Sequence, residues 1–146
     1  METIFHKVSK SSEHVIYFVF RVMVGLLFSF HGMQKLGWFS GPKGALSPAM
    51  FAGFMHLPVW TGYLVAYVEL LAGFAIMLGL FSRLVAIIAG IDMIAALFIA
   101  HFPQGWNPIL TGSELAFLYL LAFLVIFAMG SGKWALERAM CKNECF

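Results

Sequence analysis

Four long apolar segments constrain the fold of this chain more than any other feature. They extend over about residues 15–36, 60–81, 83–101 and 112–130. A helix crosses the hydrocarbon core of a bilayer in roughly 20 residues, so each segment has the length of one crossing. Hydrophobic residues make up 62% of the chain and charged residues only 11%, which excludes an ordinary soluble domain. The sequence predicts an all-α integral membrane protein, with one four-transmembrane-helix bundle over residues 1–146.

The distribution of basic residues predicts the orientation of this bundle. Cytoplasmic loops carry an excess of Lys and Arg, so the richer side should be the cytoplasmic one. That side would hold Lys7, Lys10, Arg83, Lys133, Arg138 and Lys142, against Lys35 and Lys43 on the other. Both the N- and C-termini are therefore predicted to be cytoplasmic. The first apolar segment is too long for a signal peptide and contains Arg21, so we expect no cleavage.

The loop after the first segment contains signals for a short helix. Ser47 is a favourable N-cap, Pro48 fits the first helical position, and Pro58 prevents continuation. The helix would be apolar and would lie at the membrane interface, where it could cover the outer end of the bundle. Its apolar side chains are Met50, Phe51, Phe54 and Met55.

Ionisable residues lie within or at the ends of the apolar segments, where a charge is costly and usually serves a function. They are Arg21, His31, Lys35, Glu69, Asp92 and His101. At about 100° per residue, Arg21, Lys35 and two glycines share one face of the first helix. These glycines, Gly25 and Gly32, would permit close approach of a partner helix, so this face should point into the bundle.

Depth along the helices divides these residues into two predicted clusters, the first near the bilayer midplane. Glu69 and Asp92 each lie about nine residues from a helix end, and the long side chain of Arg21 can reach toward either. We expect an Arg21–Glu69 or an Arg21–Asp92 ion pair. With one cation for two acids, charge balance predicts that one carboxyl is protonated. This polar clasp either sets the helix register or belongs to a proton relay.

The second predicted cluster lies at the outer face. His31 and Lys35 are one turn apart, His101 ends the third segment, and Glu114 begins the fourth. Each residue also has a simpler explanation. The segment 111–114 matches a capping box, and a helix C-terminus stabilises a histidine without any ligand. His56 and Gln104 are further candidates for this cluster.

A small redox ligand, most plausibly a quinone, explains the outer cluster best. Quinone carbonyls accept hydrogen bonds from His or Lys, quinone reduction requires protons, and the tail of a quinone is apolar. His101 and Glu114 would handle protons. The ligand contacts would come from His31, Lys35, Gln104 and Trp106. No metal site is predicted, because the spacing of His and Glu is not diagnostic, and no C-x-x-C-H motif indicates haem.

The two cysteines do not by themselves indicate a redox site. Cys141 and Cys145 lie in a tail that is predicted to be cytoplasmic, where thiols usually stay reduced. The sequence leaves open whether they pair, bind a metal or have no role. Phosphate-binding glycine loops are absent, and nothing predicts binding of nucleic acid.

The order of these polar residues also resembles a known family. The resemblance rests on the run 21–35, the run 69–83, then His101 and Glu114, and finally Gly130-Ser-Gly-Lys. Together they resemble the DoxX family of small four-helix bacterial membrane proteins, from residue 21 to about residue 136. The resemblance implies a multi-pass protein of the bacterial inner (plasma) membrane, related to DoxD, the membrane subunit of thiosulfate:quinone oxidoreductase. It transfers the polar positions Arg21, Lys35, Glu69, Arg83, His101 and Glu114, whereas Asp92 has no clear match.

Three functions fit these observations. The first is a membrane subunit of a quinone-linked oxidoreductase system that binds its ligand at the outer cluster. The second is a non-catalytic membrane anchor or assembly partner for a soluble or membrane oxidoreductase subunit, with the polar residues serving helix packing. A small-solute transporter fits less well, because four helices leave little room for alternating access unless the chain forms a homo-oligomer.

Overall fold

The computed structural model describes residues 4–39 and 47–141, and the side chains from Ser12 onward. All regular structure in these residues is helical, as the sequence predicts. The elements are α1 (Ile4–Lys35), α2 (Pro48–Phe54), α3 (Val59–Leu78), α4 (Ser82–Ala96), the π-helical turn η1 (Leu97–His101), the 3-10 turn η2 (Phe102–Gln104), α5 (Pro108–Thr111), α6 (Glu114–Met129) and α7 (Leu136–Cys141).

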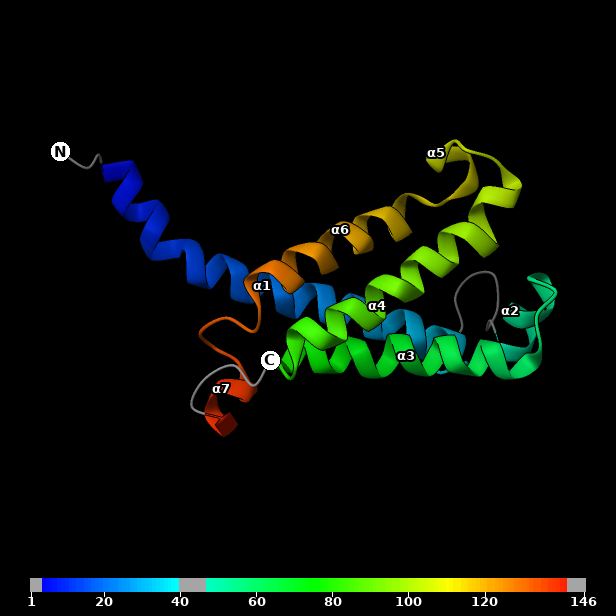
Figure 1. Cartoon of the computed structure of the whole chain (residues 1–146), viewed down its shortest axis with the longest axis horizontal. Coiled ribbons are helices and arrows are strands. Elements are labelled where there is room, and N and C mark those ends of the chain that lie inside the picture. Colours follow the sequence, from blue (N-terminus) through cyan, green and yellow to red (C-terminus); the bar gives the residue numbers. More distant parts are fainter. Residues whose placement is uncertain (1–3, 40–46, 142–146) are drawn as a thin grey trace.

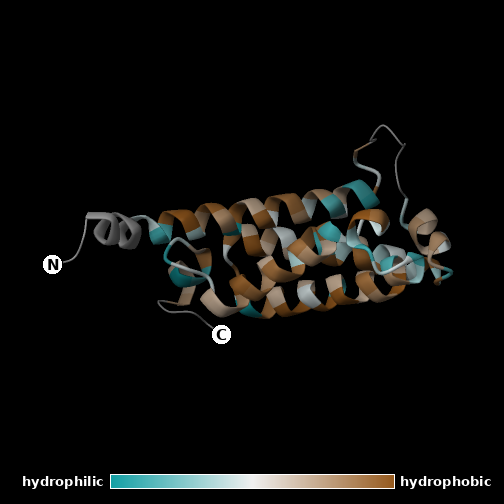
Figure 2. Ribbon diagram, turned by 90° about the horizontal axis from the view of Figure 1, so that it is seen from above, coloured by the Kyte–Doolittle hydropathy of each residue, from teal (hydrophilic) through white to brown (hydrophobic). Residues whose placement is uncertain are grey.

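Four long helices lie side by side along the molecule, and the shorter ones close its two ends (Figure 1). Helix α1 packs mainly on α3, and α4 packs mainly on α6. Helices α2 and α5 lie at one end, whereas α7 lies at the other, toward which the first turns of α1 extend (Figure 1). Apolar residues cover most of the four long helices (Figure 2), as a surface in contact with lipid requires.

Three helical segments of the described chain are long and apolar enough to cross a membrane. They are Ser12–Lys35, Val59–Leu78 and the continuous stretch Ser82–Gln104. Helix α6 is apolar but has only 16 residues, about 24 Å at 1.5 Å per residue, which is shorter than the roughly 30 Å hydrocarbon core. The all-α membrane class is therefore confirmed. A fourth crossing and the cytoplasmic position of the termini stay predictions, and Lys43 and Lys142 lie outside the described residues.

The observed helix boundaries differ from the predicted ones for local reasons. Helix α1 begins at Ile4 rather than near residue 15. Helix α3 ends at Leu78 because Gly79 adopts a left-handed conformation, with φ of 71°, and its N–H returns to the carbonyls of Ala75 and Ile76. The third predicted segment is α-helical only to Ala96, after which the chain continues through the wider π-helical turn η1 and the tighter 3-10 turn η2.

The glycine face of α1 packs directly against the backbone of α3, as the sequence predicts. A Cβ atom on Gly25 would lie 2.5 Å from the amide nitrogen of Met77, and one on Gly32 would lie 2.5 Å from that of Leu70. Gly73 of α3 makes the reciprocal approach, because its Cβ would lie 2.4 Å from the Ser29 nitrogen. Helices in lipid associate largely by such close packing, so this seam fixes the register of α1 on α3.

The predicted short helix is present as α2. The Ser47 side chain caps it by accepting a hydrogen bond from the Met50 amide at 3.1 Å. Helix α2 packs on the first turns of α3, where a Cβ on Gly62 would lie 1.9 Å from the carbonyl oxygen of Pro48. This close approach holds α2 across the end of the bundle (Figure 1). Its depth in the membrane stays a prediction.

The predicted ion pair of Arg21 with Glu69 or Asp92 is wrong. The guanidinium of Arg21, which is 1% exposed, donates to the carbonyls of Ile76 at 2.7 Å, Met77 at 3.2 Å and Trp134 at 2.7 Å. The last carbonyls of a helix lack partners and carry negative partial charge, so the end of α3 attracts the cation. Ile76 lies about 10 Å along the helix from Glu69, which places Arg21 at the other end of the bundle.

Further polar contacts close this end. The Tyr17 hydroxyl donates to the carbonyl of Gly130, and the Ser131 hydroxyl donates to the Glu137 carboxylate. The amide of Glu137 donates to the Gly79 carbonyl at 3.2 Å. These bonds tie α7 to the end of α3 and to the turn after α6, and they tie α1 to that same turn, so the Arg21 region is a structural closure. Cys145 lies outside the described residues, and the role of the two cysteines stays open.

Candidate functional site

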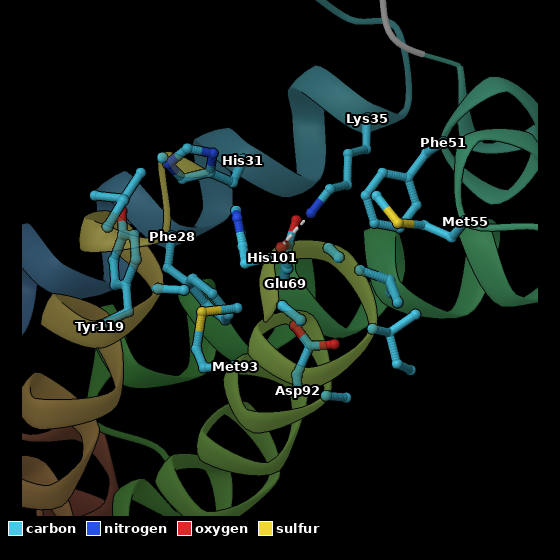
Figure 3. Close-up of a pocket in the computed structure, with 18 of the residues that line it drawn as sticks. Phe28, His31, Lys35, Phe51, Met55, Glu69, Asp92, Met93, His101 and Tyr119 are labelled. Atoms are coloured by element: carbon cyan, nitrogen blue, oxygen red, sulfur yellow. Dashed lines mark hydrogen bonds and ion pairs between the residues drawn. The ribbon is translucent and has the colours of Figure 1, made fainter. Parts of the chain in front are cut away.

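A cavity of about 250 Å³ lies inside the bundle near α2 and α5, at the end opposite the Arg21 closure (Figure 3). All four long helices contribute to its wall, together with α2 and η1. Most of the wall is apolar, including Phe28, Met93, Ala96, Ile99 and Leu115. An engineered cavity of roughly 150 Å³ binds benzene, so this space is large enough for a substituted aromatic ring.

An ion pair between α1 and α3 lies in this cavity. The Lys35 ammonium group donates to one carboxylate oxygen of Glu69, Oε1, and lies 4.8 Å from the centre of the Phe51 ring (Figure 3). Glu69 is only 3% exposed, and its second oxygen, Oε2, is buried without a hydrogen-bond partner. A buried carboxylate oxygen without a donor is costly, so this atom is poised to accept a hydrogen bond.

Asp92 of α4 adds a second carboxyl group to the same space (Figure 3). Its Oδ2 atom is also buried without a hydrogen-bond partner. Asp92 is close enough to Glu69 and Lys35 to interact electrostatically with both. Two acidic side chains therefore share the single lysine that lines this cavity.

Two histidines and a tyrosine complete the polar part of the wall. The His31 ring meets the Tyr119 ring edge-on, with centroids 5.7 Å apart and planes at 90°. The Nδ1 atom of His101 lies 3.0 Å from the Thr111 carbonyl oxygen. Because a carbonyl only accepts, this bond requires a hydrogen on Nδ1, and in the neutral ring Nε2 is then an acceptor. His101 ends the π-helical turn η1, a type of distortion that often occurs at functional sites.

The structure joins the two predicted clusters into one. His31, Lys35 and His101, expected at the outer face, line the same cavity as Glu69 and Asp92, expected at the midplane. Lys35 joins them because its long side chain extends from the end of α1 to Glu69 in the bundle interior. The division by helix depth is therefore wrong, although these five residues were all singled out from the sequence.

Glu114 does not join this group. Its side chain is exposed and does not line the cavity, although Gly112 and Leu115 do. The predicted capping box is also wrong. Thr111 belongs to α5 and donates to the Asn107 carbonyl at 3.0 Å, and the N-cap of α6 is Ser113.

The predicted ligand contacts Gln104 and Trp106 also lie outside the cavity wall. Gln104 donates to the Ala100 carbonyl at 2.7 Å and lines a neighbouring hollow together with His56. Trp106 is 81% exposed and stacks on Phe102, with ring centroids 4.8 Å apart. Both follow the π-helical turn, which directs the chain away from the cavity after His101.

Sequence reasoning missed Tyr119. It brings a hydroxyl group to a wall that is otherwise aromatic and aliphatic on the α6 side, and it lies beside Phe28, with ring centroids 5.2 Å apart. One signal could have identified it, because no other residue between 115 and 129 carries a polar side-chain atom. Within residues 4–39 and 47–141, no three His, Cys, Asp or Glu side chains gather closely enough to hold a metal ion.

The fold and the cavity define a class: a small helical membrane protein that encloses a largely apolar cavity with buried charged groups. The chain belongs to the DoxX family, whose profile matches residues 16–102. This match includes α3, α4 and the part of α1 from residue 16 onward, and with them every charged residue of the cavity.

Relatives of similar length support this membership. The chain is 31% identical over 130 residues to an uncharacterized protein of Haemophilus influenzae, which covers 84% of this chain and 89% of that protein. It is 28% identical over 124 residues to "Putative oxidoreductase CatD" of Bacillus subtilis, covering 85% and 86%. It is 29% identical over 136 residues to "Inner membrane protein YqjF" of Escherichia coli, covering 92% and 98%. No solved structure matches the chain.

Proposed function

We propose that the cavity binds the ring of a quinone or a similar small aromatic redox ligand. The protein would then be the membrane subunit of a quinone-linked oxidoreductase system in the bacterial inner membrane. One observation carries the proposal: a ring-sized apolar cavity contains two buried carboxyl oxygens, Glu69 Oε2 and Asp92 Oδ2, that have no hydrogen-bond partner. Ligand sites commonly combine an apolar wall with a few convergent polar groups.

The wall suits a flat, partly polar ring. Phe28 and Tyr119 offer aromatic surfaces on one side, and Met93 offers a polarisable thioether (Figure 3). His31 and Lys35 supply donors for oxygen atoms on a ring, whereas Nε2 of a neutral His101 accepts a hydrogen bond from a hydroxyl group. Binding would relieve the cost of the unpaired carboxyl oxygens, which rises in surroundings of low dielectric.

A neighbouring hollow offers a place for an apolar tail. It shares Phe51, Met55, Ile99 and Ala100 with the cavity and continues to Pro103. The tail would lie between α2 and η1, beside the exposed side chain of Ile99. A lipid-soluble ligand could therefore keep its ring in the cavity and its tail toward the bilayer.

The names of two relatives support the two parts of this proposal. The Bacillus subtilis relative is named an oxidoreductase, as "Putative oxidoreductase CatD", and the Escherichia coli relative is named an inner membrane protein. Glu114 has no part in the revised site, because it is exposed and lies outside the wall. Proton handling would fall to His101, Asp92 or Glu69 instead.

The test measures ligand binding by the intact protein in detergent. Lipid extracted from the purified protein is analysed for quinones, and thermal unfolding is followed with a tailless benzoquinone in its oxidised and reduced forms. At 100 times its dissociation constant a ligand stabilises by about 2.7 kcal/mol, which raises Tm by roughly 5–10 °C. We expect such a shift for at least one form.

Two Ala→Leu variants locate the binding site. Ala96→Leu adds volume at the cavity wall and should abolish the Tm shift, whereas Ala128→Leu, on the exposed surface of α6, should leave it unchanged. Equal shifts in both variants would place the ligand elsewhere. No shift with either form and no extracted quinone would overturn the proposal and favour a non-catalytic membrane anchor.

A further inference from the structure

We infer that the cavity selects the reduced, dihydroxy form of its ligand, a hydroquinone, over the oxidised quinone. This inference rests on the proposed function and adds the redox state of the ligand to it. It follows from which polar atoms of the cavity have partners and which do not.

The fully buried polar atoms of the cavity that have no partner are carboxyl oxygens, which accept hydrogen bonds when ionised. Glu69 Oε2 and Asp92 Oδ2 are buried without a donor. His101 uses Nδ1 for the Thr111 carbonyl, so its other ring nitrogen, Nε2, accepts when the ring is neutral. A hydroquinone carries two hydroxyl donors, whereas the two carbonyls of a quinone only accept. The acceptors therefore match the reduced form.

The remaining polar groups do not offset this preference. The Lys35 ammonium group directs N–H groups to Glu69 Oε1 and to the face of the Phe51 ring, and a further N–H can donate to a ligand oxygen in either form, since carbonyl and hydroxyl oxygens both accept. His31 and Tyr119 can each donate or accept, since the imidazole has two tautomers and a hydroxyl rotates. They satisfy either form of the ligand and therefore do not discriminate between the forms.

Protonation of one of the two carboxyl groups would reduce the preference for hydroquinone over quinone without reversing it. A hydrogen on Asp92 would provide one donor for a quinone carbonyl. Glu69 Oε2 and His101 Nε2 would still lack donors, and each would face an acceptor-only ligand. A hydroquinone supplies hydrogens to both of these acceptors, so it stays the better-matched form when Asp92 is protonated.

The experiment compares dissociation constants of three probes under anaerobic conditions, with the intact protein in detergent. The probes are a tailless dimethoxy-methyl-benzoquinone, its hydroquinone, and the dimethyl ether of that hydroquinone, which keeps the ring but has no donor. Hydrogen bonds to charged acceptors predict that the hydroquinone binds roughly tenfold or more tightly than the quinone. The ether should bind no better than the quinone.

Asp92→Asn tests the origin of the preference. The amide has nearly the shape of the carboxylate but adds two N–H donors, so the hydroquinone-to-quinone affinity ratio should fall by roughly tenfold. Glu13→Gln, an exposed acid on α1, is the matched control and should leave the ratio unchanged. A ratio that is the same in Asp92→Asn and Glu13→Gln would refute the role of Asp92.

Binding measurements on the wild-type protein alone test the preference for the hydroquinone, whether or not the Asp92→Asn variant folds. Equal binding of quinone and hydroquinone, or tighter binding of the quinone, would overturn the inference while leaving the proposed function intact. Failure of both forms to bind would instead overturn the proposed function. The two failures are therefore distinguishable.

Discussion

Gly32→Ala should separate α1 from α3 and loosen the cavity at the same time. The added Cβ would lie 2.5 Å from the Leu70 nitrogen, 2.6 Å from the Ala66 oxygen and 2.8 Å from the Leu70 Cα. All three atoms belong to the backbone of α3, so no side-chain rotation can relieve the clash. Carbon atoms normally approach to about 3.5–4.0 Å, and the helices must therefore move apart by about 1 Å.

The expected loss of folding free energy in Gly32→Ala follows from this overlap. Overpacking of a buried site costs about 1–3 kcal/mol. The matched control is Gly90→Ala in the middle of α4, where the new Cβ would meet only Leu120 Cδ1 at 3.8 Å, an ordinary contact. That variant should be neutral or gain up to about 1 kcal/mol from helix propensity. The two buried Gly→Ala changes should thus differ by about 1–4 kcal/mol.

Thermal and denaturant unfolding in detergent micelles measure this difference. Because Lys35 lies one turn after Gly32, the displaced α1 should also weaken the Lys35–Glu69 ion pair and any ligand binding in the cavity. Equal stability of Gly32→Ala and Gly90→Ala would refute the close α1–α3 seam. Loss of stability with unchanged ligand affinity would show that the cavity does not depend on this seam.

Three further predictions follow from the polar contacts. Arg21→Met should lower the free energy of unfolding by about 2–4 kcal/mol, because the carbonyls of Ile76, Met77 and Trp134 lose a charged donor. Trypsin should then release α7 more rapidly. Lys35→Met and Glu69→Gln should show a coupling of about 1–3 kcal/mol in a double-mutant cycle of unfolding, and additive effects would contradict the ion pair. Glu114→Gln should leave ligand affinity unchanged, whereas a tenfold loss would restore its sequence-based role.

The sequence was sufficient to predict features that depend on local pattern. The apolar runs predict the membrane helices, because a bilayer requires long hydrophobic helices whatever their arrangement. The Ser47-Pro48 pair predicts α2 because capping involves neighbours in the chain. Gly25 and Gly32 predict the packed face of α1 because helical periodicity alone places them together.

Partner choice could not be predicted in this way. Helix depth predicts Arg21 as the partner of Glu69 or Asp92, and it places Lys35 in the separate outer cluster. Only the tertiary structure shows that carbonyl groups at the end of α3 accept hydrogen bonds from Arg21, and that the flexible Lys35 side chain extends to Glu69. The direction of the chain after His101, which removes Gln104, Trp106 and Glu114 from the cavity, likewise depends on η1.

The sequence by itself determined a helical membrane protein and identified the charged residues that line its cavity, because a charge in lipid is costly and is therefore noticeable wherever it lies. The tertiary structure alone decided that these residues form one cavity, which acid holds the lysine, and which carboxyl oxygens stay without a donor. Those properties depend on distances between helices far apart in the chain, and no local pattern encodes such distances.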